Sequence, residues 1–156
     1  MHIVRYILFG MNRLDVIPSL VLSAHALARI AAQEAGNEAP SAQWRSLGIL
    51  ERRGSLRLGE LAQAARTTQP GMTRLIGILE HAGLARRTAD PADTRATLVS
   101  ATAEGLQALA DWRAEMRDTL APRFSGLDDE DWTALQRAAE ILAAHSQESN
   151  TTGDAA

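Results

Sequence analysis

Side chains that can hydrogen-bond to a nucleic acid gather at the start of one predicted helix, over residues 68–74. Gln69 can pair with adenine, and Arg74 can bind guanine or a phosphate group. Thr73 can bond to a phosphate or touch the methyl group of thymine. The other candidate contacts at this helix start are Thr67, Thr68, Pro70 and Gly71. This set of residue types predicts a surface that reads the major groove of duplex DNA.

Pro70 and Gly71 suit the first turn of such a helix. The first-turn amides have no partner within a helix, so a proline stiffens this turn at little cost. Gly71 lacks a side chain at a point where the backbone can approach DNA. Taken alone, an ordinary capped amphipathic helix would also explain this segment.

A second group of candidate contacts lies on a predicted hairpin that follows this helix. Arg86 and Arg87 lie on its first strand, and Asp93 and Arg95 lie near its tip. An arginine at a loop tip can enter a minor groove, where a narrow groove concentrates negative potential. Phosphate would repel Asp93, so we expect its carboxylate to orient Arg95 or to cap the loop backbone. A solvated turn with a weak surface ion pair is the alternative.

Apolar residues at three- and four-residue spacing predict the helices that must position these groups. The pattern predicts helices over residues 14–35, 41–53, 59–65 and 69–82, then one between Thr102 and Pro122 and a last one over 129–145. It also predicts a strand-like piece over 55–58 and two extended pieces, 84–88 and 97–101, joined by a turn-rich loop over 89–94. The fold class is therefore mainly α with a small β wing, and its centre is a helix-turn-helix followed by the wing. In the last helix we expect an inward face, formed by Trp132, Leu135, Ala139 and Leu142.

The charge is distributed unevenly along the 156 residues, whose formal net charge is −3. Residues 45–101 carry nine arginines and five acids, a net +4, whereas residues 102–156 carry a net −7. The local field decides whether a surface can approach phosphate, so the middle of the chain remains suited to nucleic acid. All basic residues are arginine, for which base composition of the genome is the simplest explanation. The length predicts a single domain.

Several kinds of function find no support in the sequence. The absence of cysteine excludes disulfides and thiolate metal sites. The four histidines have no metal-ligand spacing, and no nucleotide-binding or nucleophile motif occurs, so we expect no enzyme, no cofactor and no metal. No uninterrupted apolar run reaches the roughly 18 residues that cross a bilayer, so no membrane partner is expected. We expect residues 1–10 to be an upstream extension of the true start and residues 147–156 to be a disordered tail.

The chain resembles the MarR family of winged helix-turn-helix transcription factors (multiple antibiotic resistance regulators). The resemblance covers the chain from about residue 14 to residue 145, and the wing pattern Asp, any residue, Arg is its most specific part. It is carried by these segments: Gly59-Glu60-Leu61-Ala62, Thr68-Gln69-Pro70-Gly71-Met72-Thr73-Arg74-Leu75, Leu79-Glu80-His81-Ala82-Gly83-Leu84-Ala85-Arg86-Arg87, Asp90-Pro91-Ala92-Asp93-Thr94-Arg95 and Thr102-Ala103-Glu104-Gly105.

The resemblance implies a winged helix-turn-helix lobe over residues 41–101, flanked by dimerisation helices over 14–40 and 103–146. It implies a cytoplasmic homodimer that binds a pseudo-palindromic operator on double-stranded DNA, with Arg95 in the wing contact and Asp93 supporting it. It also implies that many relatives are repressors released by small aromatic ligands held between the dimer helices and the DNA-binding lobe. His25 and Trp44 could line such an effector site, although an ordinary core or surface role explains both residues as well.

Two positions depart from the family pattern. Arg57 stands where relatives usually have a serine or threonine cap, which weakens the short helix or adds a phosphate contact. Ala101 replaces the leucine that relatives usually have, which reduces the apolar packing under the wing. A winged-helix module that binds proteins and has lost DNA binding is the alternative function, but such a module has no need for Arg74, Arg87 and Arg95 on one face.

Overall fold

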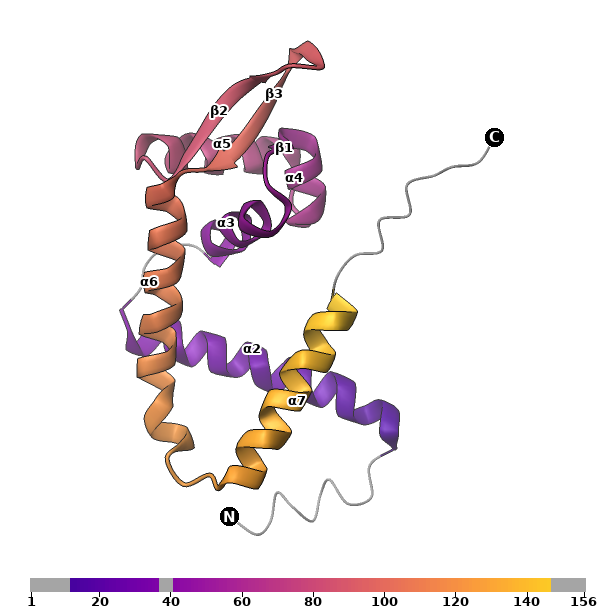
Figure 1. The fold of residues 1–156 in the computed structure, drawn as a ribbon, viewed down its shortest axis with the longest axis vertical. Coiled ribbons are helices and arrows are strands. Elements are labelled where there is room, and N and C mark those ends of the chain that lie inside the picture. Colours follow the sequence, from indigo (N-terminus) through magenta and orange to yellow (C-terminus); the bar gives the residue numbers. More distant parts are fainter. Residues whose placement is uncertain (1–11, 37–40, 147–156) are drawn as a thin grey trace. The chain divides into compact units, whose positions relative to one another are not determined.

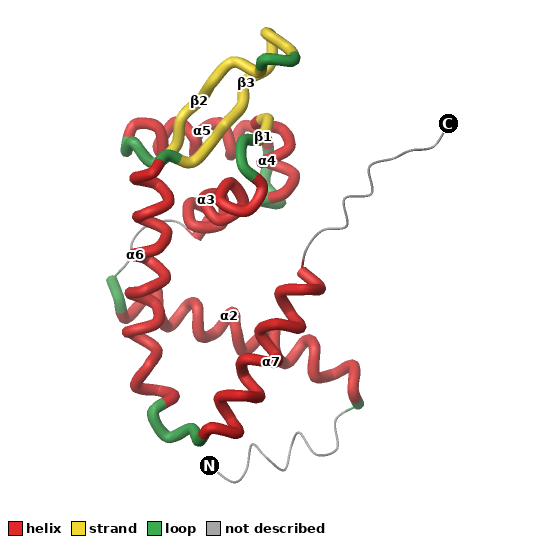
Figure 2. The backbone as a smooth tube through the Cα atoms, in the orientation of Figure 1, coloured by secondary structure: helices red, strands yellow, loops and turns green. Residues whose placement is uncertain are grey.

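The chain forms mainly helices together with one small sheet (Figures 1 and 2). The computed structural model describes residues 12–36 and 41–146. The elements up to the wing are η1 (Arg13–Asp15), α2 (Val16–Glu34), α3 (Ser41–Arg53), β1 (Leu56–Arg57), α4 (Leu58–Ala64) and α5 (Gln69–His81). They are followed by β2 (Ala85–Asp90), β3 (Asp93–Ala101), α6 (Ala103–Leu120), η2 (Ala121–Phe124) and α7 (Asp129–Ser146). The predicted fold class is confirmed, and the ends of the predicted helices differ from these bounds by a few residues at most.

The core of the helix-turn-helix is formed by apolar side chains that α3, α4 and α5 turn toward one another. Leu47 of α3 and Leu61 of α4 have no exposed surface. Met72, Ile76 and Leu79 of α5 are also fully buried, at the i, i+4 and i+7 spacing of one helix face. This face fixes the rotation of α5 about its axis, and it leaves the polar residues of the first turns on the opposite side.

The turn between α4 and α5 is tight and is held by backbone hydrogen bonds. Arg66 adopts a φ of 51°, a left-handed conformation that glycine takes more readily because it lacks a Cβ. The Thr67 N–H donates to the Ala62 carbonyl at 2.9 Å and so closes the turn. Thr68 then caps α5, since its Oγ1 accepts from the Gly71 N–H at 3.2 Å.

The sheet has three antiparallel strands in the order β1-β3-β2. Leu98 of β3 pairs with Arg57 of β1 on one side and with Thr88 of β2 on the other. The strands of the hairpin run to Asp90 and from Asp93, with an irregularity in the register between residues 89 and 90. The predicted six-residue loop over 89–94 is therefore wrong, because cross-strand pairing continues to within two residues of the tip. Figure 1 shows the hairpin projecting away from the helices.

The start of α6 is packed directly against the end of α5. The Thr102 Oγ1 accepts from the Gly105 N–H at 3.0 Å, which caps α6, and donates to the Gly83 carbonyl at 2.6 Å. Gly105 is buried, and a Cβ at this position would lie 2.0 Å from the Leu84 carbonyl oxygen. Only glycine permits this close approach of α6 to the segment that leads into the wing.

The chain divides into two compact units, one up to Leu120 and one from Ala121 onward. In the second unit, Asp128 caps α7, since its Oδ1 accepts from the Asp131 N–H at 2.9 Å. The predicted burial along α7 is wrong for the single chain, because Trp132, Leu135 and Leu142 are 51%, 41% and 37% exposed and Ala139 is exposed too.

The first long helix also leaves apolar side chains uncovered. Val16, Ile17, Val21 and Leu22 of α2 are each at least 41% exposed. By length and composition, one stretch of the described residues, Arg13–Glu34, could cross a membrane, with a mean hydropathy of 1.4. The stretch is not an uninterrupted apolar run, because Asp15, His25 and Arg29 lie within it. One such helix is no evidence of a membrane span by itself, because the core helix of a soluble protein can have the same length and hydropathy.

Candidate nucleic-acid interface

The first turns of α5 present the predicted major-groove residues on the surface. Gln69, Pro70, Thr73 and Arg74 are exposed, as are Thr67 and Thr68 before them. The Thr73 hydroxyl donates to the Gln69 carbonyl at 2.8 Å, so its oxygen lone pairs remain free to accept. Among the described residues, the Arg74 side chain makes no hydrogen bond or ion pair, and its guanidinium is therefore available to a duplex.

Gly71 has a local reason for being glycine. A Cβ at this position would lie 3.1 Å from Thr68 Oγ1 and 3.3 Å from Thr67 Oγ1. Both distances are shorter than usual van der Waals contacts, so the threonine cap and a side chain at residue 71 compete for the same space. The missing side chain also leaves the surface of this helix turn open, as the sequence interpretation expected.

The tip of the hairpin carries an exposed arginine, Arg95. The Arg95 N–H donates to Asp93 Oδ1 at 3.1 Å, which is the backbone cap expected of Asp93. Within the part of the chain that the structure describes, the Arg95 guanidinium has no hydrogen bond or ion pair, and the residue is exposed. Asp93 thus shapes the backbone that carries Arg95 and does not occupy its side chain.

Arg87, on β2, has partners on α5. Its guanidinium donates to Glu80 Oε2 at 2.5 Å and to the Thr73 carbonyl at 3.4 Å. Arg86, the preceding residue, donates to Ser100 Oγ across the hairpin at 3.1 Å. Arg87 therefore links the wing to the helix whose first turns carry the candidate base contacts.

Arg57 does not act as a side-chain cap for α4. Its backbone N–H donates to Glu60 Oε2 at 2.8 Å, and its guanidinium binds Asp90 Oδ2 through Nε at 2.8 Å and Nη2 at 2.7 Å. Asp90 is buried, with 6% of its surface exposed. The hydrogen bond from the Ala92 N–H, together with the Arg57 guanidinium, lowers the pKa of the Asp90 carboxyl below its ordinary value.

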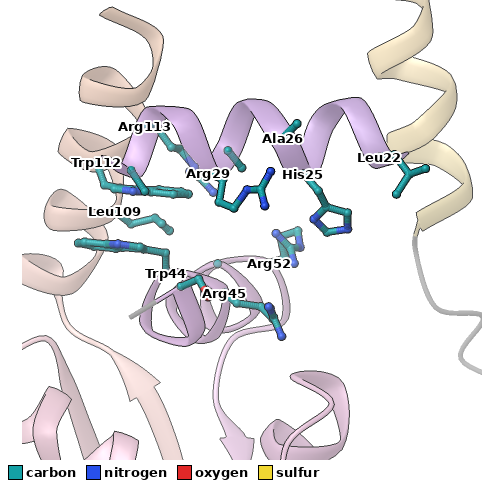
Figure 3. Close-up of a pocket in the computed structure, with 14 residues that line it drawn as sticks. Leu22, His25, Ala26, Arg29, Trp44, Arg45, Arg52, Leu109, Trp112 and Arg113 are labelled. Carbon is teal, nitrogen blue, oxygen red and sulfur yellow. The ribbon is translucent and has the colours of Figure 1, made fainter. Parts of the chain in front are cut away.

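His25 and Trp44, the two residues considered for an effector, line the same pocket, which has a volume of about 760 Å³. Its lining comes from α2, α3 and α6. Figure 3 shows His25 and Arg29 extending from α2 toward the side chains of α3. Among the described residues that line the pocket, none is acidic and four are arginines: Arg29, Arg45, Arg52 and Arg113. The pocket thus combines positive charge with an apolar wall.

Two indole rings form that wall. Trp44 and Trp112 stack with their centroids 5.3 Å apart and their planes 10° apart. The Trp44 Nε1 is buried and lacks a hydrogen-bond partner within the described chain. Arg113, next to Trp112, binds Glu51 through both of its terminal nitrogens, at 2.9 and 2.7 Å, and this hydrogen bonding lowers the pKa of the Glu51 carboxyl.

The pocket arginines and the pair formed by Arg57 and Asp90 were missed at the level of sequence. A signal existed for the pocket, since His25 and Arg29 lie four residues apart on one helix face. The separation of 33 positions between Arg57 and Asp90 offers no comparable signal. The described residues contain no cluster of three or more metal-ligating side chains.

A helix-turn-helix whose second helix exposes polar first turns, followed by a hairpin with arginines, defines a winged helix-turn-helix DNA-binding protein. The MarR family model matches residues 40–97. An HTH-type transcriptional regulator of Mycobacterium bovis, Mb0904, is 32% identical over 107 residues, which cover 69% of this chain and 75% of that protein. The chain therefore belongs to the MarR family of HTH-type regulators; it is a DNA-binding transcriptional regulator and not an enzyme.

A second relative and two solved structures extend the comparison. The regulator ML2140 of Mycobacterium leprae is 30% identical over 100 residues, covering 64% of this chain and 70% of its own. The crystal structure of RV1404 from Mycobacterium tuberculosis superposes with a TM-score of 0.68 at 23% identity, covering 89% of this chain and 98% of that one. Wild-type MarR from E. coli, in its apo form, superposes with a TM-score of 0.65 at 16% identity, covering 85% and 97%. At these identities, the two structures establish the fold alone.

Proposed function

We propose that the protein is a repressor that binds a pseudo-palindromic operator as a homodimer and that a small aromatic anion releases it. The observation that carries this proposal is the exposed, unpaired state of Arg74 and Arg95 among the described residues. One arginine lies in the first turns of α5, and the other lies at the tip of the hairpin. These positions suit a major-groove contact and a minor-groove contact made by one lobe.

The proposed DNA contacts are Thr67, Thr68, Gln69, Pro70, Gly71, Thr73, Arg74, Arg87, Asp93 and Arg95. We assign Gln69 and Arg74 to base edges or phosphate, and Arg95 to the minor groove. Arg87 and Asp93 have partners inside the protein, so their contribution is chiefly to hold the interface in shape. The winged lobe over residues 41–101 is the proposed DNA-binding part of a single functional domain.

The decisive experiment is a titration of labelled duplex from the region upstream of the protein's own gene, monitored by fluorescence anisotropy at several salt concentrations. Neutralisation of phosphates requires the affinity to fall steeply as salt rises. A complex that is specific and sensitive to salt supports the proposal. Absence of any such complex with every upstream fragment would favour the alternative, a winged-helix module that binds proteins.

The proposed dimer uses the apolar faces of α2 and α7, with Ile17, Leu20, Leu27, Leu135 and Leu142 as its principal residues. The exposure of apolar side chains on each of these helices supports it, since water-exposed apolar surface of this extent commonly marks an interface. Each aliphatic side chain that becomes fully buried in the interface would stabilise the dimer by about 1.5–3 kcal/mol. Light scattering should give the mass of a dimer, and a stable monomer at micromolar concentration would contradict this part.

The proposed effector site is the pocket that His25 and Trp44 line. The arginines and the absence of acidic lining residues favour an anion over a cation, and the stacked indoles favour a planar ring. A thermal-shift screen should find that aromatic carboxylic acids raise the melting temperature, whereas their neutral amides do not. Equal shifts from acid and amide would contradict the anion preference.

Trp44 and Trp112 provide an intrinsic probe for the same site. A ligand that stacks beside them should quench their fluorescence, and the variant Trp132→Phe removes the emission of the third tryptophan, in α7. An acid that quenches the fluorescence and also lowers the affinity for operator would support release of the proposed repressor by a ligand. Quenching without a change in DNA affinity would leave the pocket without a regulatory role.

A further inference from the structure

The ion pair of Arg57 and Asp90 spans the full width of the small sheet. Arg57 lies on β1, Asp90 ends β2, and β3 lies between these two strands. The guanidinium reaches Asp90 Oδ2 with both Nε and Nη2, at 2.8 and 2.7 Å. Because the carboxylate is almost fully buried, removal of Arg57 leaves a charge that is poorly solvated, whereas the Arg57 side chain is itself 45% exposed.

Asp90 in turn shapes the turn at the tip of the hairpin. Its second oxygen, Oδ1, accepts from the Ala92 N–H at 2.9 Å. The register of the hairpin is irregular at this residue, and Asp93 and Arg95 follow directly after the turn. One carboxylate therefore connects the body of the lobe, through Arg57, to the backbone that carries the Arg95 side chain.

We propose that Arg57 is a positioning residue for DNA binding: through Asp90 it holds the hairpin tip so that Arg95 is presented to the minor groove. Two of the guanidinium nitrogens are bound to the carboxylate, which directs the side chain toward the protein. Its effect on DNA binding is thus transmitted through Asp90 and the tip, and not through a phosphate contact of its own. The inference rests on the proposed contact of Arg95.

A double-mutant cycle on operator affinity tests this route. Arg95→Ala should weaken binding about tenfold or more, as expected for the loss of one good arginine contact. Arg57→Ser introduces a residue type that relatives usually have as the helix cap at this position. It should weaken binding about fivefold to tenfold in the wild-type background. In the Arg95→Ala background the same change should cost less than about twofold, because the tip no longer carries the group that Arg57 positions.

The cycle separates the two hypotheses. If Arg95→Ala leaves the affinity unchanged, the proposed wing contact itself fails. If Arg95→Ala weakens binding but Arg57→Ser does not, the positioning role fails while the wing contact stands. Equal losses from Arg57→Ser in both backgrounds would show that Arg57 contacts phosphate independently, and they would overturn the inference.

The variant Asp90→Asn tests whether loss of the Asp90 carboxylate weakens or strengthens DNA binding. It removes a negative charge from the lobe and leaves Arg57 unpaired, so electrostatics alone would tighten DNA binding. Asparagine has one acceptor oxygen in place of two, so it can accept from Arg57 or from the Ala92 N–H but not from both, and the tip would lose one of its two supports. The positioning role therefore requires weaker binding by Asp90→Asn, whereas tighter or unchanged binding would overturn it.

Matched controls distinguish positioning from loss of charge or of folding. Arg117→Ser removes one arginine from an exposed ion pair on α6 and should leave the affinity within about twofold. Arg57→Lys keeps the charge without the fork geometry and should give an intermediate affinity. Thermal melts followed by circular dichroism should show that every variant is folded at the temperature of the binding assay. If Arg57→Ser and Asp90→Asn are unfolded at that temperature, the positioning role is tested with Arg57→Lys at a lower temperature.

Discussion

Arg87 and Glu80 form a direct link between the wing and α5, with Nη1 2.5 Å from Oε2 and the second terminal nitrogen bound to the Thr73 carbonyl. The pair comes from residues seven apart, on either side of the turn that leads from the helix into β2. A movement of the hairpin therefore has to break or carry along a contact to the turn of α5 that holds Thr73. The pair thus joins the strand that leads to the hairpin tip to the helix that carries Thr73 and Arg74.

Arg87→Ala tests whether this arginine also touches the duplex. Loss of the partly exposed ion pair should lower the free energy of unfolding by up to about 1 kcal/mol, measured by urea titration. If Arg87 contributes a phosphate contact, the salt dependence of log affinity should become shallower by about 0.9 for each protomer. An unchanged slope would remove Arg87 from the proposed contacts and leave it as a link between β2 and α5.

Arg95→Ala should weaken operator binding about tenfold or more, that is by about 1.4 kcal/mol or more, without changing the dimer or its stability. The Arg95 side chain has no partner in the described chain, so its removal leaves no buried group unsatisfied. Fluorescence anisotropy gives the affinity, and light scattering and thermal melting give the other two quantities. A loss of folding or of the dimer in this variant would contradict the assignment, and Arg117→Ala serves as the control for charge.

Gly105→Ala should destabilise the protein severely, because the new Cβ would lie 2.0 Å from the Leu84 carbonyl oxygen. Overpacking of a rigid site costs about 1–3 kcal/mol or more, and here the obstacle is backbone. The matched control is Gly77→Ala in α5, where no atom lies within 4 Å of the new Cβ. That change should stabilise the helix by up to about 1 kcal/mol. Similar melting temperatures for the two variants would contradict the tight contact between α6 and Leu84.

The sequence predicted the elements better than it predicted their contacts. The spacing of Met72, Ile76 and Leu79 placed the polar turns of α5 outward, because one buried face determines the orientation of a helix. The extent of the hairpin was not predictable, since Asp90 and Asp93 have low strand propensity and are paired only through tertiary context. The partner of Arg57 is likewise determined by the order of strands in the sheet. The exposed face of α7 could not be assigned either, because periodicity identifies an apolar face but not the chain that covers it.

The acid side of the stability profile should depend on Asp90 and Glu51. Both carboxyl groups have a pKa lowered in the folded protein, Asp90 by the Ala92 N–H and Arg57, and Glu51 by Arg113. A lowered pKa stabilises the fold at any pH above the unfolded value, which is about 4 for both carboxyl types, and this stabilisation is lost as pH falls through the lower, folded value. Urea titrations between pH 7 and pH 3 should therefore show declining stability below about pH 4. Asp90→Asn should be less stable than wild type at pH 7 and should lose less on acidification. A decline of equal size in wild type and in Asp90→Asn would show that this carboxylate does not stabilise the fold through its charge.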